Sequence, residues 1–262
     1  MTNSEILDIA LRQSAMELNC RAEDLLSSDN KVVISTENPG ARSYLRLPHK
    51  ALPFACNLVY YGGGVVASVR PELTGPVGEY LNKREPYRCF ETPGLHELDA
   101  ILAPFGIKTC FMAEYFLPDV EKLKPLCCEH EIRILSPADF AGLYVPEWSN
   151  ALCEKRAEYD VIAVGAYDGG KLIALAGASA DCEDMWQIGI DVLPGYRRQG
   201  IASSLVSRLA MEILDRGKVP FYCAAWSNLA SVKNAIRSGF RPAWVELTAR
   251  DNEFVNMMNI GE

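Results

Sequence analysis

A short basic turn between a predicted strand and a predicted helix carries the clearest chemistry in the sequence. It contains Arg197, Arg198 and Gly200. Glycine has no Cβ, so an anion can approach its backbone closely, and arginines add charge-assisted hydrogen bonds. The first turn of a helix also presents backbone N–H groups without partners, and its dipole attracts negative charge. The turn therefore predicts an anion site, for which a phosphate is a natural occupant.

Two elements must position this turn. The apolar run at residues 186–192 ends in β-branched side chains and predicts a strand. Pro194 and Gly195 end that strand, because proline cannot donate to a ladder and glycine turns freely. From Ile201 onward the apolar residues recur at helical spacing, and Gly217 stands where a helix should stop. The predicted apolar face consists of Ile201, Leu205, Val206, Leu209, Ile213 and Leu214.

The turn and its flanks resemble a known signature. Arg197-x-x-Gly200-x-Ala202, preceded by Val192-x-Pro194, is similar to the acyl-CoA motif of the GNAT superfamily of N-acetyltransferases. The resemblance implies that backbone amides of residues 198–203 hold the CoA pyrophosphate. It also implies that the backbone around Val192 pairs with the pantetheine arm and holds the thioester carbonyl. The alternative is an ordinary strand–turn–helix corner with solvated arginines.

The cofactor-binding residues that the resemblance implies lie mostly in this one stretch. They are Val192, Arg197, Arg198, Gln199, Gly200, Ile201, Ala202, Ser203 and Asn228. Asn228 belongs to Asn228-x-x-Ser231, which is followed by Gly239-Phe240 and is similar to the family's N-x-x-A…G-F ending. Acetyl-CoA is thus the expected co-substrate.

The order of predicted elements over residues 130–250 fits the same family. It implies an α/β (α+β) fold with a mixed, mostly antiparallel GNAT-type sheet flanked by helices. Predicted strands lie at 131–135, 159–167, 171–180, 186–192, 219–226 and 241–250, and predicted helices begin at 137, 146, 201 and 228.

Residues 1–125 predict a smaller α/β domain of unknown role, and the charged, proline-containing segment 118–130 predicts the boundary. Predicted helices lie at 4–18, 22–26, 72–82 and 94–103, with Gly75-Pro76 expected to break the third early; predicted strands lie at 31–35, 54–61, 65–69 and 107–116, and Asn38-Pro39-Gly40 predicts a turn. A second hypothesis makes this half a degenerate GNAT-like copy, since both halves contain a glycine-turn hairpin. The two-domain layout resembles the zwittermicin A resistance acetyltransferase group.

The catalytic base is less well defined by the sequence. Several family members place a glutamate early on the central strand, where this chain has Trp186. A carboxylate must then come from nearby, because an ammonium acceptor has to lose a proton. Asp191, beside Val192, is the first choice, with a hydrogen-bonding strand residue as the alternative. Glu183 and Asp184 are further candidates, although solvated turn residues are the simpler interpretation.

The general acid is equally open. Many family members carry a tyrosine in the helix after the last crossover, and Ala235 stands there in this chain. Tyr222 on the neighbouring predicted strand is a substitute candidate, although tyrosines at such positions are more often packing residues. Without an acid, the CoA thiolate can leave directly, since thiol pKa values lie close to neutrality.

Composition limits the partners. The 262-residue chain has a net charge of −8 and a pI of about 5.1, which disfavours nucleic acid and anionic membranes. No apolar run is long enough to span a bilayer, and the N-terminus lacks the layout of a signal peptide. The nine cysteines are scattered and the three histidines isolated, which predicts free thiols, a cytoplasmic location and no metal site.

These features predict a cytoplasmic N-acetyltransferase that moves an acetyl group from acetyl-CoA to a small-molecule amine by direct attack in a ternary complex. Acidic residues near the predicted acceptor side would suit a cationic amine, and the family resemblance adds antibiotics as a substrate class. The alternative from a different class is a CoA-binding sensor or regulatory module without turnover. A third hypothesis is a longer acyl donor.

Overall fold

The computed structural model describes residues 1–37 and 53–260, which divide into two compact units. The first unit consists of Met1–Ala10 and Phe116–Pro242, and the second of Leu11–Tyr115 and Ala243–Glu262. Each unit therefore takes two separate stretches of chain, whereas the sequence predicted two consecutive domains, 1–125 and 130–250. Helix α1 (Asn3–Leu18) and strands β4 (Ile107–Pro118) and β10 (Phe240–Asp251) contribute residues to both units.

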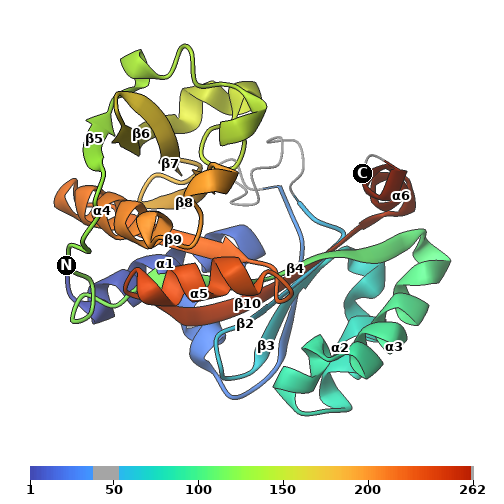
Figure 1. Ribbon diagram of the computed structural model, residues 1–262. Coiled ribbons are helices and arrows are strands. Elements are labelled where there is room, and N and C mark those ends of the chain that lie inside the picture. The colour runs from blue at the N-terminus through green and yellow to red at the C-terminus, as the bar shows by residue number, and fades with distance from the viewer. Residues whose placement is uncertain (38–52, 261–262) are drawn as a thin grey trace. The chain divides into compact units, whose positions relative to one another are not determined.

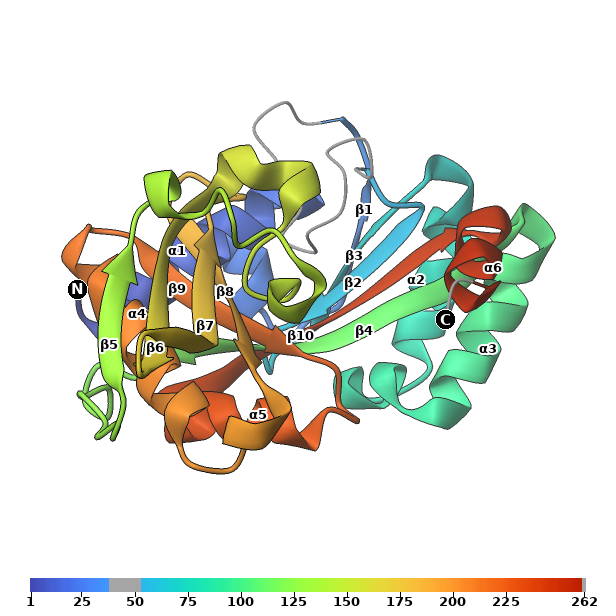
Figure 2. The same cartoon turned by 45° about the horizontal axis from the view of Figure 1, so that its top comes forward.

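Five strands and two helices make up most of the first unit. The strands are β5 (Glu131–Leu135), β6 (Asp160–Asp168), β7 (Lys171–Ser179), β8 (Met185–Val192) and β9 (Val219–Ala224); the helices are α4 (Ile201–Asp215) and α5 (Leu229–Arg237). The strands lie in the order β9-β8-β7-β6-β5 (Figure 2). Every neighbouring pair is antiparallel except β8 and β9, which are parallel. This mixed, largely antiparallel sheet confirms the predicted fold class.

Helix α4 packs across one face of β6, β7 and β8 (Figure 1). Its apolar stripe is buried as predicted, because residues three and four apart share one helix face. Ile201, Leu205 and Leu209 all lie in the core between α4 and the sheet. The helix stops before Gly217, whose φ of +73° a glycine adopts without strain. A smaller core on the other face of the sheet contains Phe140, Trp148 and Leu152.

The second unit is built around another sheet, in the order β1-β3-β2-β10-β4. Its further elements are β1 (Lys31–Ile34), β2 (Cys56–Tyr60), β3 (Val65–Val69), α2 (Thr74–Asn82), α3 (Thr92–Leu102) and α6 (Asn252–Ile260). Strand β2 is antiparallel to both β3 and β10 over its whole length. Val77 and Leu81 of α2 and Leu98 of α3 are buried against this sheet. No helix in the described part of the chain is long and apolar enough to cross a membrane.

Some local predictions were wrong. The single helix expected from residue 146 to 158 is two short 3-10 segments, Pro146–Trp148 and Glu154–Tyr159. The segment from 137 holds a capping box of Ser136 and Asp139 but only the single 3-10 turn Pro137–Asp139. Gly75-Pro76 lies inside the first turn of α2 and does not break it, because a proline there needs no N–H partner. The turn expected at residues 38–40 lies outside the described residues, and α6 was not expected.

Candidate functional site

The corner before α4 presents open backbone nitrogens. Gly200 is the helix N-cap, with a φ of +83°, and a Cβ added there would meet no atom within 4 Å. The N–H of Ser204 donates to the Gly200 carbonyl oxygen at 3.1 Å. Among the described residues, the N–H groups of Ile201, Ala202 and Ser203 have no recorded partner, as the first turn of a helix requires. This corner is therefore accessible to an anion.

The basic turn is held in shape by its own side chains. The Tyr196 hydroxyl donates to Asp168 Oδ2 at 2.9 Å, and Arg197 Nε donates to the Val192 carbonyl oxygen at 3.0 Å. Gln199 Nε2 reaches the Gly195 carbonyl oxygen at 3.4 Å. Arg198 is exposed and has a φ of +65°, in the left-handed region that side-chain-bearing residues seldom occupy. Arg197 and Gln199 thus fix the turn, and Arg198 adds positive charge at its surface.

Two predicted cofactor-binding side chains have internal partners. The Ser203 hydroxyl is buried and donates to Asn234 Oδ1 at 2.9 Å, which leaves the backbone N–H of Ser203 for a ligand. Asn228 is the N-cap of α5, and its side chain accepts from the N–H of Ser231 at 3.1 Å. Ile201 is buried in the core. The corner therefore offers mainly backbone groups.

Strand β8 pairs with β9 along its first part and with β7 along its second part, and the two ladders meet at Gln187. The parallel ladder with β9 runs from Met185–Val219 to Gln187–Phe221, but β8 continues to Val192. The antiparallel ladder with β7 goes on to the pair of Ala174 and Val192. Beyond Gln187 the edge of β8 that faced β9 is therefore unpaired.

The register shows which backbone groups line this unpaired edge. The N–H of Leu193 donates to the Ile173 carbonyl oxygen at 3.0 Å, so the facing pair of Val192 and Ala174 is of the non-hydrogen-bonded type. The N–H and C=O of Val192 then point away from β7, and so do those of Ile190, because strand geometry repeats every two residues. Ile190 and Val192 present two N–H groups at the opening. Residues 193–200 connect the end of this strand to the start of α4, where the anion corner lies.

Tyr222 belongs to a polar chain beside this opening. Its hydroxyl lies 2.8 Å from Ser231 Oγ, and Asn234, which also accepts from Ser203, is a second neighbour. The side chain is 3% exposed. Burial raises the pKa of Tyr222, and hydrogen bonds to Ser231 and Asn234 only partly oppose this. The hydroxyl therefore remains protonated at neutral pH and can donate a proton.

The three candidate carboxylates lie at opposite ends of β8. Asp191 accepts three hydrogen bonds, from the N–H and Nδ2 of Asn150 and from the N–H of Ala151, at 2.7–3.0 Å. Asp184 precedes the strand and pairs with Lys218 Nζ at 3.1 Å, and Glu183 is exposed beside it. At about 3.3 Å per residue, Asp184 is roughly 26 Å from Val192. Asp191 alone of the three lies next to the opened edge.

The residues at the family's usual acid and base positions are apolar. Trp186 is half-buried against the α4 core, and Ala235 is fully buried. Neither can exchange a proton. The structure thus places no ionisable side chain at these two positions.

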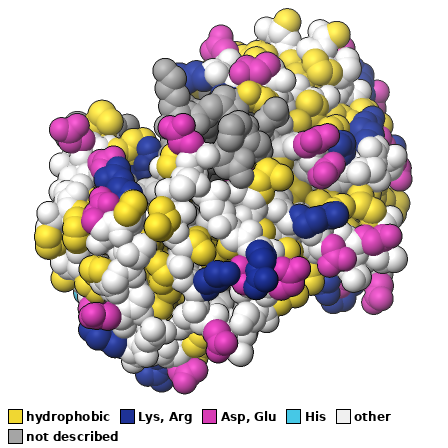
Figure 3. Space-filling model, turned by 180° about the vertical axis from the view of Figure 1, so that it is seen from behind, with side chains coloured by type: hydrophobic (Ala, Val, Ile, Leu, Met, Phe, Trp, Pro, Cys, Tyr) yellow, Lys and Arg dark blue, Asp and Glu magenta, His cyan; other side chains and the backbone are white. Residues whose placement is uncertain are grey.

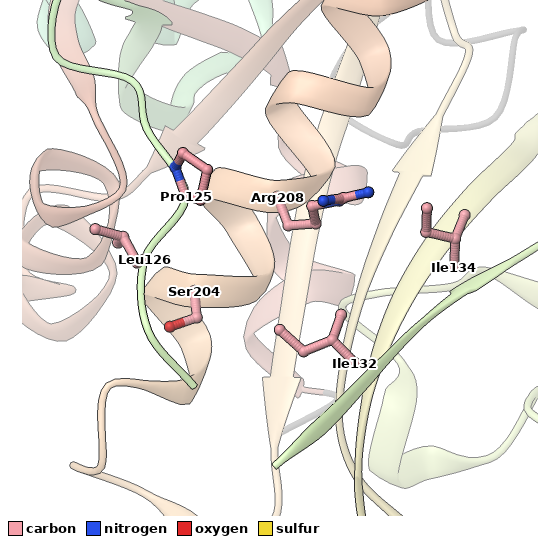
Figure 4. Close-up of a pocket in the computed structure, with 6 residues that line it drawn as sticks. All are labelled: Pro125, Leu126, Ile132, Ile134, Ser204 and Arg208. Atoms are coloured by element: carbon pink, nitrogen blue, oxygen red, sulfur yellow. The ribbon is translucent and has the colours of Figure 1, made fainter. Parts of the chain in front are cut away.

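A cavity of about 320 Å³ lies on the flank of α4 (Figure 4). Its lining residues are Pro125, Leu126, Ile132, Ile134, Ser204 and Arg208. The Ser204 hydroxyl donates to the Cys127 carbonyl oxygen at 2.8 Å and to that of Gly200 at 3.2 Å, which ties the cavity wall to the anion corner. Arg208 is paired with Glu212 at 2.7 Å. Sequence patterns did not indicate this cavity, because its walls come from three separate segments.

The electrostatic character of the molecule is mixed. On the face in Figure 3, acidic and basic side chains are interspersed. Among the described residues no group of three or more His, Cys, Asp or Glu side chains is arranged to hold a metal ion. The nine cysteines, which all lie in the described part of the chain, form no disulfide.

Comparison with known proteins gives one family. Residues 138–243, less than half of the chain, match the model described as GNAT acetyltransferase. No curated protein matches the sequence.

Similar solved structures include a putative GNAT-family acetyltransferase from Novosphingobium aromaticivorans, with 20% identity, a TM-score of 0.41, and coverage of 55% of this chain and 66% of that one. A GCN5-related N-acetyltransferase-like protein from Streptococcus suis has 20% identity, a TM-score of 0.44 and coverage of 59% and 68%. A functionally unknown conserved protein from Staphylococcus epidermidis has 15% identity, a TM-score of 0.47 and coverage of 83% and 94%. The segment that carries the anion corner and the opened strand, residues 138–243, is thus similar to the GNAT acetyltransferases.

Proposed function

We propose that this protein is an acetyl-CoA-dependent N-acetyltransferase that acts on a small-molecule amine. The observation that carries the proposal is the pairing of β8. The strand pairs with β9 from Met185 to Gln187 and with β7 from Gln187 to Val192, so its edge on the β9 side is unpaired beyond Gln187. The unpaired edge leads to the open N–H groups before α4. An extended thioester arm can pair with an unpaired strand edge, and its pyrophosphate can bind at a helix N-terminus.

The proposed reaction is a direct displacement. The amine nitrogen attacks the thioester carbonyl carbon, a C–N bond forms, and the C–S bond of acetyl-CoA breaks. The N–H of Ile190 or Val192 would donate to the carbonyl oxygen as negative charge develops on it. The amine loses one proton and the leaving thiolate gains one. Holding both reactants in place is expected to supply much of the rate enhancement.

Asp191 is the proposed base. It is next to Val192, and its carboxylate already accepts three hydrogen bonds from Asn150 and Ala151. Asp191 would take the proton of the amine directly or through a water molecule that completes its hydrogen bonding. Glu183 and Asp184 are the weaker candidates because they lie at the far end of the strand.

Tyr222 is the proposed acid. Its raised pKa keeps the hydroxyl protonated, and Ser231 and Asn234 orient it. It lies on β9, the strand that borders the opening from the other side. A proton passed from this hydroxyl to the CoA thiolate would complete the reaction.

A CoA-binding sensor without turnover is the second candidate. The apolar Trp186 and Ala235 favour it, because they replace ionisable residues at the family's usual positions. The Asp191 carboxylate also has a structural use, since it holds residues 150 and 151. In this interpretation the anion corner and the opened strand would still bind CoA.

Two measurements separate these functions. A thermal-shift titration with CoA tests binding, and thiol release from acetyl-CoA against a panel of amines tests turnover. The panel contains spermidine, lysine, a simple alkylamine and an aminoglycoside. Stabilisation together with thiol release supports the enzyme. Stabilisation without release on any amine supports the sensor, and no stabilisation at millimolar CoA rejects both.

A further inference from the structure

A row of buried polar residues crosses the face of the first unit's sheet that α4 does not cover. Asp160, Ser179 and Gln187 are successive cross-strand neighbours on β6, β7 and β8. They are 2%, 1% and 7% exposed. Their side chains point away from α4, because strand residues alternate between faces and the neighbouring Ile188 packs in the α4 core.

Most of this row is satisfied by neighbouring groups. The buried Arg156 guanidinium pairs with Asp181 and donates to Ser179 Oγ at 3.0 Å. Asp160 Oδ2 accepts from the N–H of Cys153 at 2.8 Å. These contacts fasten the irregular segment that contains Cys153 and Arg156 to the ends of β6 and β7.

Gln187 stands at the β9 end of the row and keeps a buried hydrogen-bonding atom open. Its Nε2 donates to Cys223 Sγ on β9 at 3.1 Å, but its buried Oε1 has no hydrogen-bond partner in the structure. Leaving a buried carbonyl oxygen unpaired destabilises the folded protein. Such an atom in a native site calls for a partner that the folded chain itself does not provide.

The position of Gln187 is unusual in a second respect. It is the last residue of β8 that pairs with β9, so its side chain stands where the two strands begin to separate. The next residue of β8 on the same face is Gly189, about 7 Å further along, which adds no side chain. The surface between Gln187 and the N–H of Ile190 is therefore not blocked by β8 itself.

We infer that Gln187 is an acceptor-binding residue, whose Oε1 accepts a hydrogen bond from an N–H of the attacking amine. This inference rests on the proposed function. A carbonyl oxygen accepts and never donates, so it fits an amine or ammonium group. Because the Gln187 side chain points away from α4, we expect the amine substrate to bind on that face of the sheet. In the structure the amide is oriented with Nε2 toward Cys223 Sγ, which leaves Oε1 for the amine.

The test compares two substitutions at Gln187 with one control. Gln187→Leu removes the acceptor atom and is expected to lower kcat/KM for the amine by about 10-fold to 100-fold, mainly through KM. Gln187→Glu keeps an acceptor oxygen at that place. Its kcat/KM for the amine is therefore expected to remain within about threefold of the wild-type value. Gln13→Leu is the control, because Gln13 is also buried but bonds Glu17 in the second unit.

A binding measurement keeps the inference testable without turnover. The Gln187 side-chain NH₂ resonance, assigned through its loss in Gln187→Glu, is expected to shift when spermidine or the alkylamine is added. A shift supports the inference even if thiol release is absent, in which case the enzymatic proposal fails alone. No shift with any amine of the panel, equal kcat/KM in Gln187→Leu, or equal losses in both variants overturns it. CoA-induced stabilisation must persist in each variant, which separates this outcome from failure of the CoA site.

Discussion

Strands β2 and β8 differ in how many of their backbone N–H and C=O groups are paired with neighbouring strands. In the second unit, β2 pairs with β3 and β10 along all of Cys56–Tyr60. In the first unit, β8 pairs with β9 from Met185 to Gln187 and with β7 from Gln187 to Val192, so only Gln187 is paired on both sides. A strand paired on both sides has no N–H to offer a ligand, whereas one that loses a neighbour does. Pairing on both sides stabilises β2, whereas the opened edge of β8 is the feature that the proposed binding of acetyl-CoA would use.

Proline substitutions give the sharpest test of this comparison. Ile190→Pro removes an N–H that no ladder uses, so we expect a folded protein whose kcat falls about 100-fold to 1,000-fold through loss of an oxyanion contact. Leu58→Pro removes an N–H from a doubly paired strand and should destabilise the protein by about 3 kcal/mol or more. Circular dichroism melts and thiol-release assays measure the two effects. Full activity in folded Ile190→Pro would contradict the assigned role of the opened edge.

Glycine substitutions at the two ends of α4 extend the comparison to the anion corner. Gly200 and Gly217 both have positive φ, and a Cβ at either would meet no atom within 4 Å. Gly200→Glu and Gly217→Glu should therefore cost similar backbone strain, about 1 kcal/mol. Only Gly200→Glu places a carboxylate at the proposed phosphate position, and we expect CoA binding to weaken by about 100-fold or more.

Calorimetric titration with CoA distinguishes the two variants. Gly217→Glu serves as the matched control and should retain the wild-type Kd within about threefold, since it lies at the other end of a 15-residue helix. Equal losses of affinity would show that the effect is strain rather than charge at the site.

The free energy of unfolding should depend on pH through Glu246 of the second unit, which is not one of the residues proposed to bind CoA. Glu246 is 4% exposed, and burial raises its pKa to about 7, although Asn57 Nδ2 donates to it at 2.8 Å. The unfolded chain releases this proton near pH 4.5, earlier than the folded chain does. The free energy of unfolding therefore falls as pH rises from 4.5 through 7, by about 3 kcal/mol in total from this group.

Glu246→Gln replaces the titrating carboxyl with a neutral amide of similar size. Urea denaturation at pH 5 and pH 8 should show a smaller loss of stability in this variant than in the wild type. An identical dependence in both proteins would mean that Glu246 ionises freely in the folded state.

The smallest effect is expected at the far end of β8. Asp184 is 59% exposed and forms a surface ion pair with Lys218, and such pairs contribute about 0–1 kcal/mol. Asp184→Asn should leave kcat within about twofold and stability nearly unchanged. Asp191→Asn, by contrast, should lower kcat about 100-fold if Asp191 is the base. A large loss in Asp184→Asn would reverse this assignment of the two carboxylates.

The sequence predicted those parts of the molecule that local rules determine. Apolar spacing predicted α4 and the preceding strand, and Gly200 and Gly217 marked the helix ends. Local rules failed for residues 146–158, where Asp191 and Asp160 bind the N–H groups of Asn150 and Cys153 from other strands. These bonds to side chains on β6 and β8 favour short 3-10 turns over one continuous helix, and no spacing in the sequence indicates them.

In the candidate site, too, the sequence predicted the part that is contiguous in the chain and missed the part that depends on the fold. Its anion corner is contiguous in sequence, so a motif could predict it. The separation of β8 from β9 depends on how two strands more than 30 residues apart diverge, and the Gln187–Cys223 contact exists only in the folded chain. Gln187 could have been noticed as a polar residue within an apolar predicted strand, but its open Oε1 could not.

The central claim is that main-chain nitrogens of residues 198–203, together with those of Ile190 and Val192, bind CoA. Amide nitrogen–proton NMR spectra recorded during a CoA titration test this directly. We predict that the largest shifts occur at these amides, while those of Gly217 and of β2 stay unchanged. Absence of any shift at millimolar CoA, or shifts centred elsewhere in the chain, would contradict the account.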